Sequence, residues 1–210
     1  MKSTRSKLNR IPSRGHYDPE TIHAILDNNY MCHVAFVIDG KPYCIPTAYG
    51  RKGNFIYLHG SAKSQMLQTL VDGGEACITV MQVDAIVLAR SLFHSSMNYH
   101  SVVLFGTGEE MTDPAEKMEG LRVVSESMWN GRWDEARHPT ENEMRATKVL
   151  RFPISEGSAK IRTGGAKDEK EDYALDIWAG IIPVITTYGE PVADELLKPG
   201  IEVPASVSGK

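Results

Sequence analysis

Apolar and polar positions alternate along the chain in short blocks that predict strands more often than helices. Two apolar runs, at residues 31–38 and 43–49, are separated by Asp39-Gly40, a dipeptide typical of a tight β-hairpin. Further strands are expected over residues 55–58, 76–83, 85–89, 102–106, 147–154 and 159–162. The pattern leaves open whether 76–83 and 85–89 form one long strand or two strands separated by a bend at Asp84.

Three helices are predicted between these strands. Asp18-Pro19 is typical of a helix start, and an apolar stripe follows it at residues 22, 25 and 26. A second helix is expected from Ser61 to Gly73-Gly74, and a third begins at Asp113. The buried face of the third is predicted at Met118, Leu121, Val124 and Met128. Residues 178–184 are expected to return to the core.

About seven short strands joined by tight turns, with helices inserted between hairpins, predict a mainly β fold, a small antiparallel barrel. The 210 residues fit one domain, and a hydrophobic fraction of 41% is enough for a core. We expect a flexible N-terminal segment at 1–15, the barrel domain at 16–190 and a loose C-terminal tail at 191–210.

Composition and charge exclude several classes of function. The 23 Lys and Arg against 27 Asp and Glu give a formal charge of −4, which does not favour binding to nucleic acid. No apolar run approaches the roughly 18 residues of a membrane span, and residues 1–10 do not read as a secretory signal. Three widely spaced cysteines predict reduced thiols rather than a disulfide framework or a zinc site. A cytoplasmic location is therefore expected.

The segment from Tyr57 to Met66 is the strongest candidate for chemistry. An apolar strand leads through Gly60 into Ser61, a good N-cap, and the first turn of the predicted helix also carries Lys63 and Ser64. Free N–H groups, two hydroxyls and one ammonium at the same place predict a phosphate site. The alternative is an ordinary capped helix that binds nothing.

With these elements in order, the chain resembles the pyridoxamine-phosphate-oxidase-like flavoproteins, the FMN-binding split-barrel superfamily, nearest the branch of the nitroimidazole-resistance reductases. The segments that carry the resemblance are 42–49, 56–61, 87–91, 98–102, 131–133, 159–162 and 178–180. The resemblance implies a six-stranded antiparallel split barrel. It also implies a homodimer with one FMN in each of two clefts between the subunits.

The resemblance assigns twelve positions to the cofactor site. Three border the isoalloxazine ring along one strand, three line the strand below the ring, and three hold the phosphate. One presents a polar side chain from an adjoining strand, and the last two close the cleft from the C-terminal part of the chain. In that order, the positions are Pro46, Thr47 and Ala48; Leu58, His59 and Gly60; Ser61, Lys63 and Ser64; Ser101; and Arg162 and Trp178.

The chain departs from the family pattern at two places. Ala62 precedes Lys63 where many relatives have two adjacent basic residues, and His100 stands where many close relatives have arginine. His59 either binds an anionic substrate or donates a proton, or it forms a hydrogen bond at the barrel edge. The spacing of His94 and His100 does not suit a metal site, and both are expected to be loop or edge residues.

The resemblance therefore predicts an FMN-dependent oxidoreductase that passes electrons from a reduced nicotinamide to a small organic acceptor. No catalytic residue is assigned. Two other hypotheses stay open: a non-catalytic protein that stores or senses flavin, and a haem- or deazaflavin-binding relative built on the same barrel.

Overall fold

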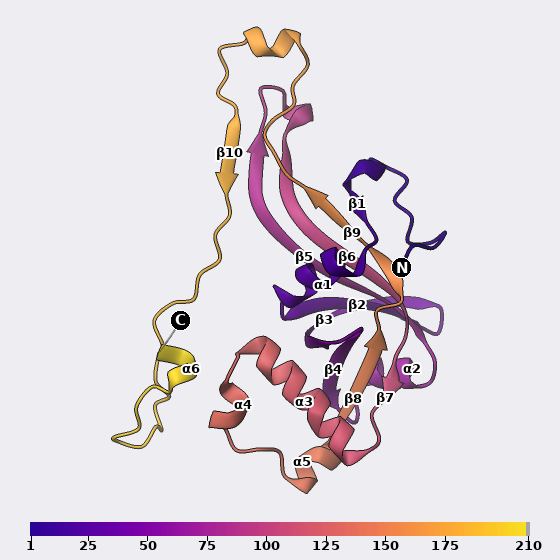
Figure 1. Ribbon diagram of the computed structural model, residues 1–210, viewed down its shortest axis with the longest axis vertical. Helices are drawn as coiled ribbons and strands as arrows, with labels where there is room; N and C mark the ends of the chain where they lie inside the picture. Colours follow the sequence, from indigo (N-terminus) through magenta and orange to yellow (C-terminus); the bar gives the residue numbers. More distant parts are fainter. Residues whose placement is uncertain (209–210) are drawn as a thin grey trace.

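The computed structural model describes residues 1–208 and is built around one strongly curled antiparallel sheet (Figure 1). Its strand order is β1-β9-β6-β5-β2-β3-β4-β8-β7, and β10 pairs with β5 outside this path. The strands are β1 Gly15–His16, β2 Met31–Ile38, β3 Lys41–Lys52, β4 Phe55–Ser61, β5 Glu75–Leu88, β6 Ser96–Thr107, β7 Glu109–Glu110, β8 Thr147–Pro153, β9 Glu156–Arg162 and β10 Gly180–Pro183.

The expected mainly β, antiparallel split-barrel fold is confirmed, with more strands than the six implied by the resemblance. Among the additional strands, β1 and β7 contain two residues each, and β10 comes from the C-terminal part of the chain. The β2–β3 hairpin is also confirmed. Asp39 and Gly40 have φ angles of 49° and 73°, the left-handed conformation that a two-residue hairpin turn requires.

In residues 1–208, six helices and three 3₁₀ turns precede the strands, lie between them or follow them. They are α1 Pro19–Asp27, α2 Gln65–Val71, α3 Pro114–Met128, α4 Arg132–Glu135, α5 Glu141–Ala146 and α6 Ala205–Ser208, with turns at Pro12–Arg14, Leu92–His94 and Glu171–Ala174. As predicted, Asp18 caps α1 by accepting a hydrogen bond from the Thr21 N–H at 2.8 Å. The buried residues of α3 are Gly120, Leu121, Val123 and Val124, so the prediction holds for Leu121 and Val124. Met118 is only partly buried, and Met128 is 46% exposed at the end of the helix.

The core lies inside the curled sheet. Alternate residues of the central strands are fully buried there, among them Val34, Tyr49, Leu58, Ile78 and Leu104. Ile22 and Leu26 of α1 join this core and close one side of it. The Tyr49 hydroxyl donates a 2.6 Å hydrogen bond to the Leu26 carbonyl, which fixes the end of α1 against β3.

The predicted N-cap of the second helix is wrong by three residues. Ser61 belongs to β4, because its backbone pairs with Thr147 of β8. The N-cap is Ser64, whose hydroxyl oxygen accepts a 3.3 Å hydrogen bond from the Leu67 N–H, and α2 begins at Gln65. Strand pairing therefore extends further along the chain than the local capping signal indicated.

Strand β5 settles the question left open at Asp84. It is one continuous strand, and its register with β6 shifts between Val83 and Ala85, so Asp84 lies at a β-bulge. Beyond the bulge, β5 and β6 continue away from the barrel as a long hairpin (Figure 1). Strand β6 begins at Ser96, six residues before the predicted start.

Residues 163–203, here called the C-terminal arm, run beside this hairpin and then back toward α3 (Figure 1). The prediction that 178–184 return to the core is wrong, since Ile181 and Ile182 are 42% and 49% exposed. Strand β2 pairs only with residues 77–79 of β5, which leaves the outer part of that edge open, and β10 pairs there with residues 85–88.

Both ends of the described chain make contacts. Ser6 is buried, and the Arg5 guanidinium forms ion pairs with Glu75 at 3.0 Å and Glu156 at 2.6 Å. Near the other end, the Ser206 carbonyl accepts a 3.0 Å hydrogen bond from the Trp129 indole. Within residues 1–208, no helix is both long and apolar enough to cross a membrane.

Candidate functional site

Strand pairing determines which of the predicted cofactor residues share a face of the sheet. Tyr49 of β3 pairs with Leu58 of β4, and both side chains point into the core. Because side chains alternate along a strand, Ala48 and His59 point to the opposite, outer face. Pro46 lies on that same face and pairs with His33 of β2.

His59 is half-buried on this outer face. Its Nδ1 atom is buried and has no hydrogen-bond partner among the described residues. Burial lowers the pKa of its imidazole, which favours the neutral form. A buried ring nitrogen without a partner is uncommon in a folded protein, and it is suited to a hydrogen bond with a bound molecule.

The predicted phosphate site at residues 61–64 is present, with fewer donor groups than the sequence predicts. Ser61 is exposed, and its hydroxyl oxygen accepts a 3.2 Å hydrogen bond from the Lys63 N–H. The Lys63 ammonium is exposed and has no acidic partner among the residues that the structure describes. Since Ser64 caps a helix of only seven residues, this site offers a cation and hydroxyl donors rather than an open helix terminus.

Ser101 lies on the same outer face, on β6, which is separated from β3 by the two strands β2 and β5. Thr79 of β5 pairs with both His33 and Val103, and Ser101 is two residues from Val103 along β6. Its hydroxyl donates a 3.3 Å hydrogen bond to the Lys160 carbonyl. Met31 and Met81, 53% and 57% exposed, give this face an apolar surface between the two groups of predicted residues.

Four predicted residues are not gathered at this face by their side chains. Thr47 pairs with the fully buried Cys32 and lies on the core side of β3, two residues from Tyr49. Leu58 is fully buried in the core, so only its backbone is available. Arg162 is buried, and its guanidinium donates a hydrogen bond to the Asn98 side chain. Trp178 is 67% exposed on the C-terminal arm, against Gly180. Within a single subunit, neither Arg162 nor Trp178 closes a cleft over Lys63.

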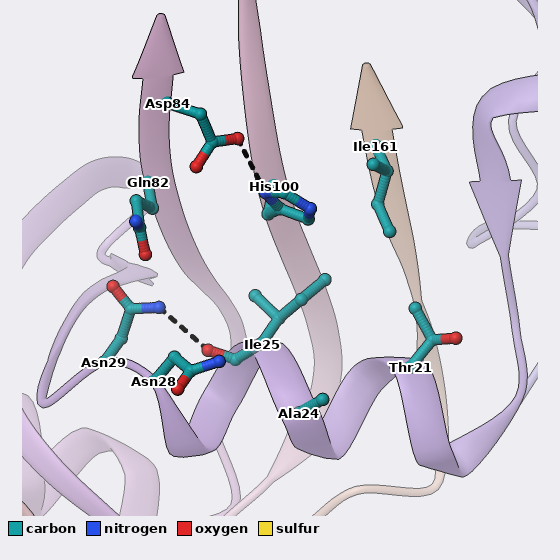
Figure 2. Close-up of a pocket in the computed structure, with 9 residues that line it drawn as sticks. All are labelled: Thr21, Ala24, Ile25, Asn28, Asn29, Gln82, Asp84, His100 and Ile161. Atoms are coloured by element: carbon teal, nitrogen blue, oxygen red, sulfur yellow. Dashed lines mark hydrogen bonds and ion pairs between the residues drawn. The ribbon is translucent and has the colours of Figure 1, made fainter. Parts of the chain in front are cut away.

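A cavity of about 560 Å³ lies on the other face of the sheet, between the C-terminal half of α1 and strands β5, β6 and β9 (Figure 2). Its lining residues are Thr21, Ala24, Ile25, Asn28, Asn29, Gln82, Asp84, His100 and Ile161. None of the twelve predicted cofactor residues is among them. This volume is within the range of roughly 300–1,000 Å³ typical of ligand and cofactor sites.

His100 is the central side chain of this cavity (Figure 2). Its Nδ1 atom is 2.6 Å from Oδ2 of Asp84, while the other ring nitrogen points away from Asp84 into the cavity. Sequence reasoning placed His100 at an edge and missed this pair. The available signal was Asp84 interrupting an apolar strand, because a bulge there turns its carboxylate toward the facing strand.

The family model described as pyridoxamine 5'-phosphate oxidase matches residues 18–161. The chain belongs to the pyridoxamine 5'-phosphate oxidase family. A search of curated proteins found no match. Groups of three or more His, Cys, Asp or Glu side chains able to hold a metal ion are absent from residues 1–208.

Two solved structures match almost the whole chain at 35% sequence identity. The flavocytochrome Anf3 from Azotobacter vinelandii has a TM-score of 0.93, with 99% of this chain and 96% of that chain covered. The FAD and heme binding protein from Mycobacterium smegmatis has a TM-score of 0.89, with coverages of 93% and 96%. A third structure, a protein from Bacteroides thetaiotaomicron named for 5-nitroimidazole antibiotic resistance, is 22% identical with a TM-score of 0.59. The match covers 70% of this chain and 86% of that one, and it supports the fold alone.

The buried state of His59 predicts a pH effect on stability. Because its folded-state pKa is lowered, the unfolded chain takes up a proton near pH 6.5 that the folded chain still resists. This part of the stability is complete above about pH 6.5 and is lost as the pH falls below it. His59→Leu should therefore show a smaller drop in urea midpoint than the wild type between about pH 7.5 and 5.5. His138→Leu is the matched control, and equal drops in the His59 variant and the wild type would contradict the assignment.

Proposed function

We propose that this protein is a flavin- and haem-binding redox protein that works as a homodimer. The observation that carries the proposal is that both 35%-identical structures, whose names include flavin or FAD and a cytochrome or haem, match the chain over 93% or more of its length. The agreement therefore includes much of the C-terminal arm, which lies outside the family model at 18–161.

The outer face has groups that fit a flavin. His59 offers a buried ring nitrogen without a partner, and Lys63 offers an exposed cation for a phosphate. The flavin that best agrees with the relatives is FAD, whereas the sequence resemblance by itself predicts FMN. A bound flavin would supply hydride and single-electron chemistry, with a reduced nicotinamide as the proposed donor. The protein residues would anchor the phosphate, exclude water from the ring and hold His59 neutral beside it.

The inner face has a cavity that fits the second cofactor. His100 would offer the iron a ring nitrogen, and the cavity of about 560 Å³ beside it would hold the macrocycle. His100 and Ser101 are successive residues of β6 and point to opposite faces of the sheet. The two proposed sites therefore lie back to back, separated by one layer of sheet. This arrangement suits electron transfer between two cofactors.

The homodimer is proposed because one subunit leaves the flavin face incomplete. Met31 and Met81 on that face, and Leu92 and Phe93 at the hairpin tip, are more than half exposed. The hairpin and the C-terminal arm project together from the barrel (Figure 1). A second copy would cover these apolar surfaces and supply the missing wall of the flavin site.

The visible spectrum of the purified full-length chain tests the cofactor assignment directly. We expect both flavin bands and a Soret band, either as isolated or after addition of FAD and haemin. Mass spectrometry of the released flavin then separates FAD from FMN. A deazaflavin spectrum, or no colour after reconstitution, would contradict the proposal. Steady oxidation of a reduced nicotinamide by the loaded protein would distinguish an oxidoreductase from a non-catalytic flavin binder.

Lys63→Ala should weaken flavin binding at least about tenfold, because a charge-assisted hydrogen bond to phosphate contributes about 1.5–3 kcal/mol. Fluorescence titration of the flavin-free protein with FAD and with FMN measures the effect. Lys167→Ala, which removes an exposed lysine of the C-terminal arm, is the matched control. A Lys63 variant that binds both flavins as tightly as the control would rule out the phosphate role.

Light scattering of the eluted protein should give the mass of two chains for the wild type. Met81→Asp should shift the population toward one chain and weaken flavin binding, because it places a charge in the centre of the proposed interface. Asn142→Asp, an exposed change on α5, should leave the mass unchanged. A wild-type protein that is monomeric with full flavin occupancy would refute the proposed dimer.

A further inference from the structure

We propose that His100 would ligate the haem iron through its free ring nitrogen and that Asp84 is its positioning residue. This inference rests on the haem part of the proposed function and names the residues of the chain that would hold the iron. It follows from the geometry of the inner-face cavity, and nothing in the relatives' names assigns a ligand.

Side-chain contacts can be compared for five of the chain's seven histidines. His23 contacts Asn54, His94 pairs with Glu169 at the hairpin, and His138 stacks on Trp133. His59 lies on the outer face with its Nδ1 unpaired. Of the described histidines, His100 alone lines the 560 Å³ cavity, and two smaller cavities of about 330 Å³ contain no histidine.

The hydrogen bond between His100 and Asp84 also supports the assignment. A histidine that binds a metal usually donates its other ring N–H to a carboxylate or carbonyl, which fixes the ring and increases its basicity. The 2.6 Å contact between Nδ1 of His100 and Oδ2 of Asp84 has this form. It leaves Nε2 as the ligand atom, directed into the space above Ile25 and beside Ile161 (Figure 2).

The lining of the cavity combines apolar and polar side chains. Ala24, Ile25 and Ile161 form the apolar part of the lining, which would contact the face of a macrocycle, while Thr21, Asn28, Asn29, Gln82 and Asp84 give the rest of the cavity polar side chains. Gln82, His100 and Ile161 are neighbours in register across β5, β6 and β9, so the sheet itself sets their spacing. The site is therefore held by strands rather than by loops.

The C-terminal arm is also connected to this site. The backbone N–H of Val184 in the arm donates a 2.9 Å hydrogen bond to the carbonyl of Asp84. The arm therefore fixes the bulge that aims the carboxylate at His100. Asp168, with a fully buried side chain, holds the arm to the hairpin by accepting hydrogen bonds from the N–H groups of Arg90 and Ser91, both at 3.1 Å. An arm shared with the two haem-named relatives thus supports the proposed ligand.

The test is haemin titration of the full-length wild type, His100→Ala and Asp84→Asn, followed by optical and electron paramagnetic resonance spectra. We expect the wild type to show a histidine-ligated haem and His100→Ala to lose that signature or the haem itself. Added imidazole should restore the signature in the His100 variant. His94→Ala and His138→Ala are the matched controls and should keep the wild-type spectrum.

Asp84→Asn tests the positioning role. It should reduce haem affinity by about 10–100-fold and raise the midpoint potential, because a less basic imidazole stabilises the ferric state less. Flavin binding should be unchanged in both variants, which shows that they are folded. Unchanged haem spectrum and potential in Asp84→Asn would overturn the role of Asp84.

The outcomes separate the two levels of the proposal. Wild-type protein that binds flavin but takes up no haemin overturns the haem part of the proposed function and this assignment together. Wild-type protein that binds haem with the same spectrum as His100→Ala overturns the ligand assignment alone.

Discussion

The bulge at Asp84 is the feature on which the inner-face site depends. A regular strand would pair residue 84 with residue 98 of β6, whereas here the register shifts between Val83 and Ala85 and Asp84 has no partner in the ladder. The bulge turns Asp84 out of the ladder, and its side chain and carbonyl then serve different partners. The side chain holds His100 on β6, and the carbonyl accepts from Val184 of the C-terminal arm. One irregular residue thus connects the hairpin, the cavity and the arm.

The outer and inner faces of the sheet carry different groups of polar side chains. On the outer face lie Ala48, His59 and Ser101, with exposed methionines between them and no enclosing wall in one subunit. On the inner face, α1 stops short of residues 82 and 100, and the space that it leaves is the 560 Å³ cavity. Because side chains alternate along β6, neighbouring residues contribute to different sites without any change of backbone direction.

The two faces also differ in how much of a binding site one chain forms. The cavity by His100 is already bounded by a helix and three strands, so its residues are positioned within one chain. The outer face is a surface without an enclosing wall in one subunit. Under the proposed function, the inner site is therefore formed within one chain and the outer site depends on a second copy.

Local signals in the sequence predicted much of the fold, and particular residues show where such signals fail. Asp39-Gly40 and the cap at Asp18 were predicted correctly, because both depend only on neighbouring backbone groups. The start of α2 was placed at Ser61 instead of Ser64, because pairing with β8 extended β4 past the capping residue. Trp178 and Ile181 were apolar enough to suggest core. Instead, Ile181 lies in β10, which pairs with the open edge of β5, and Trp178 is exposed.

The sequence by itself determined the antiparallel barrel, the order of its elements and the segments that carry the family resemblance, since hydrophobic period and turn chemistry are local properties. Only the tertiary structure decided which polar residues meet. His100 and Asp84 are sixteen positions apart on facing strands, and neither forms a recognisable motif in one dimension. Their contact depends on strand register and on one bulge, and both are set by the packing of the whole sheet.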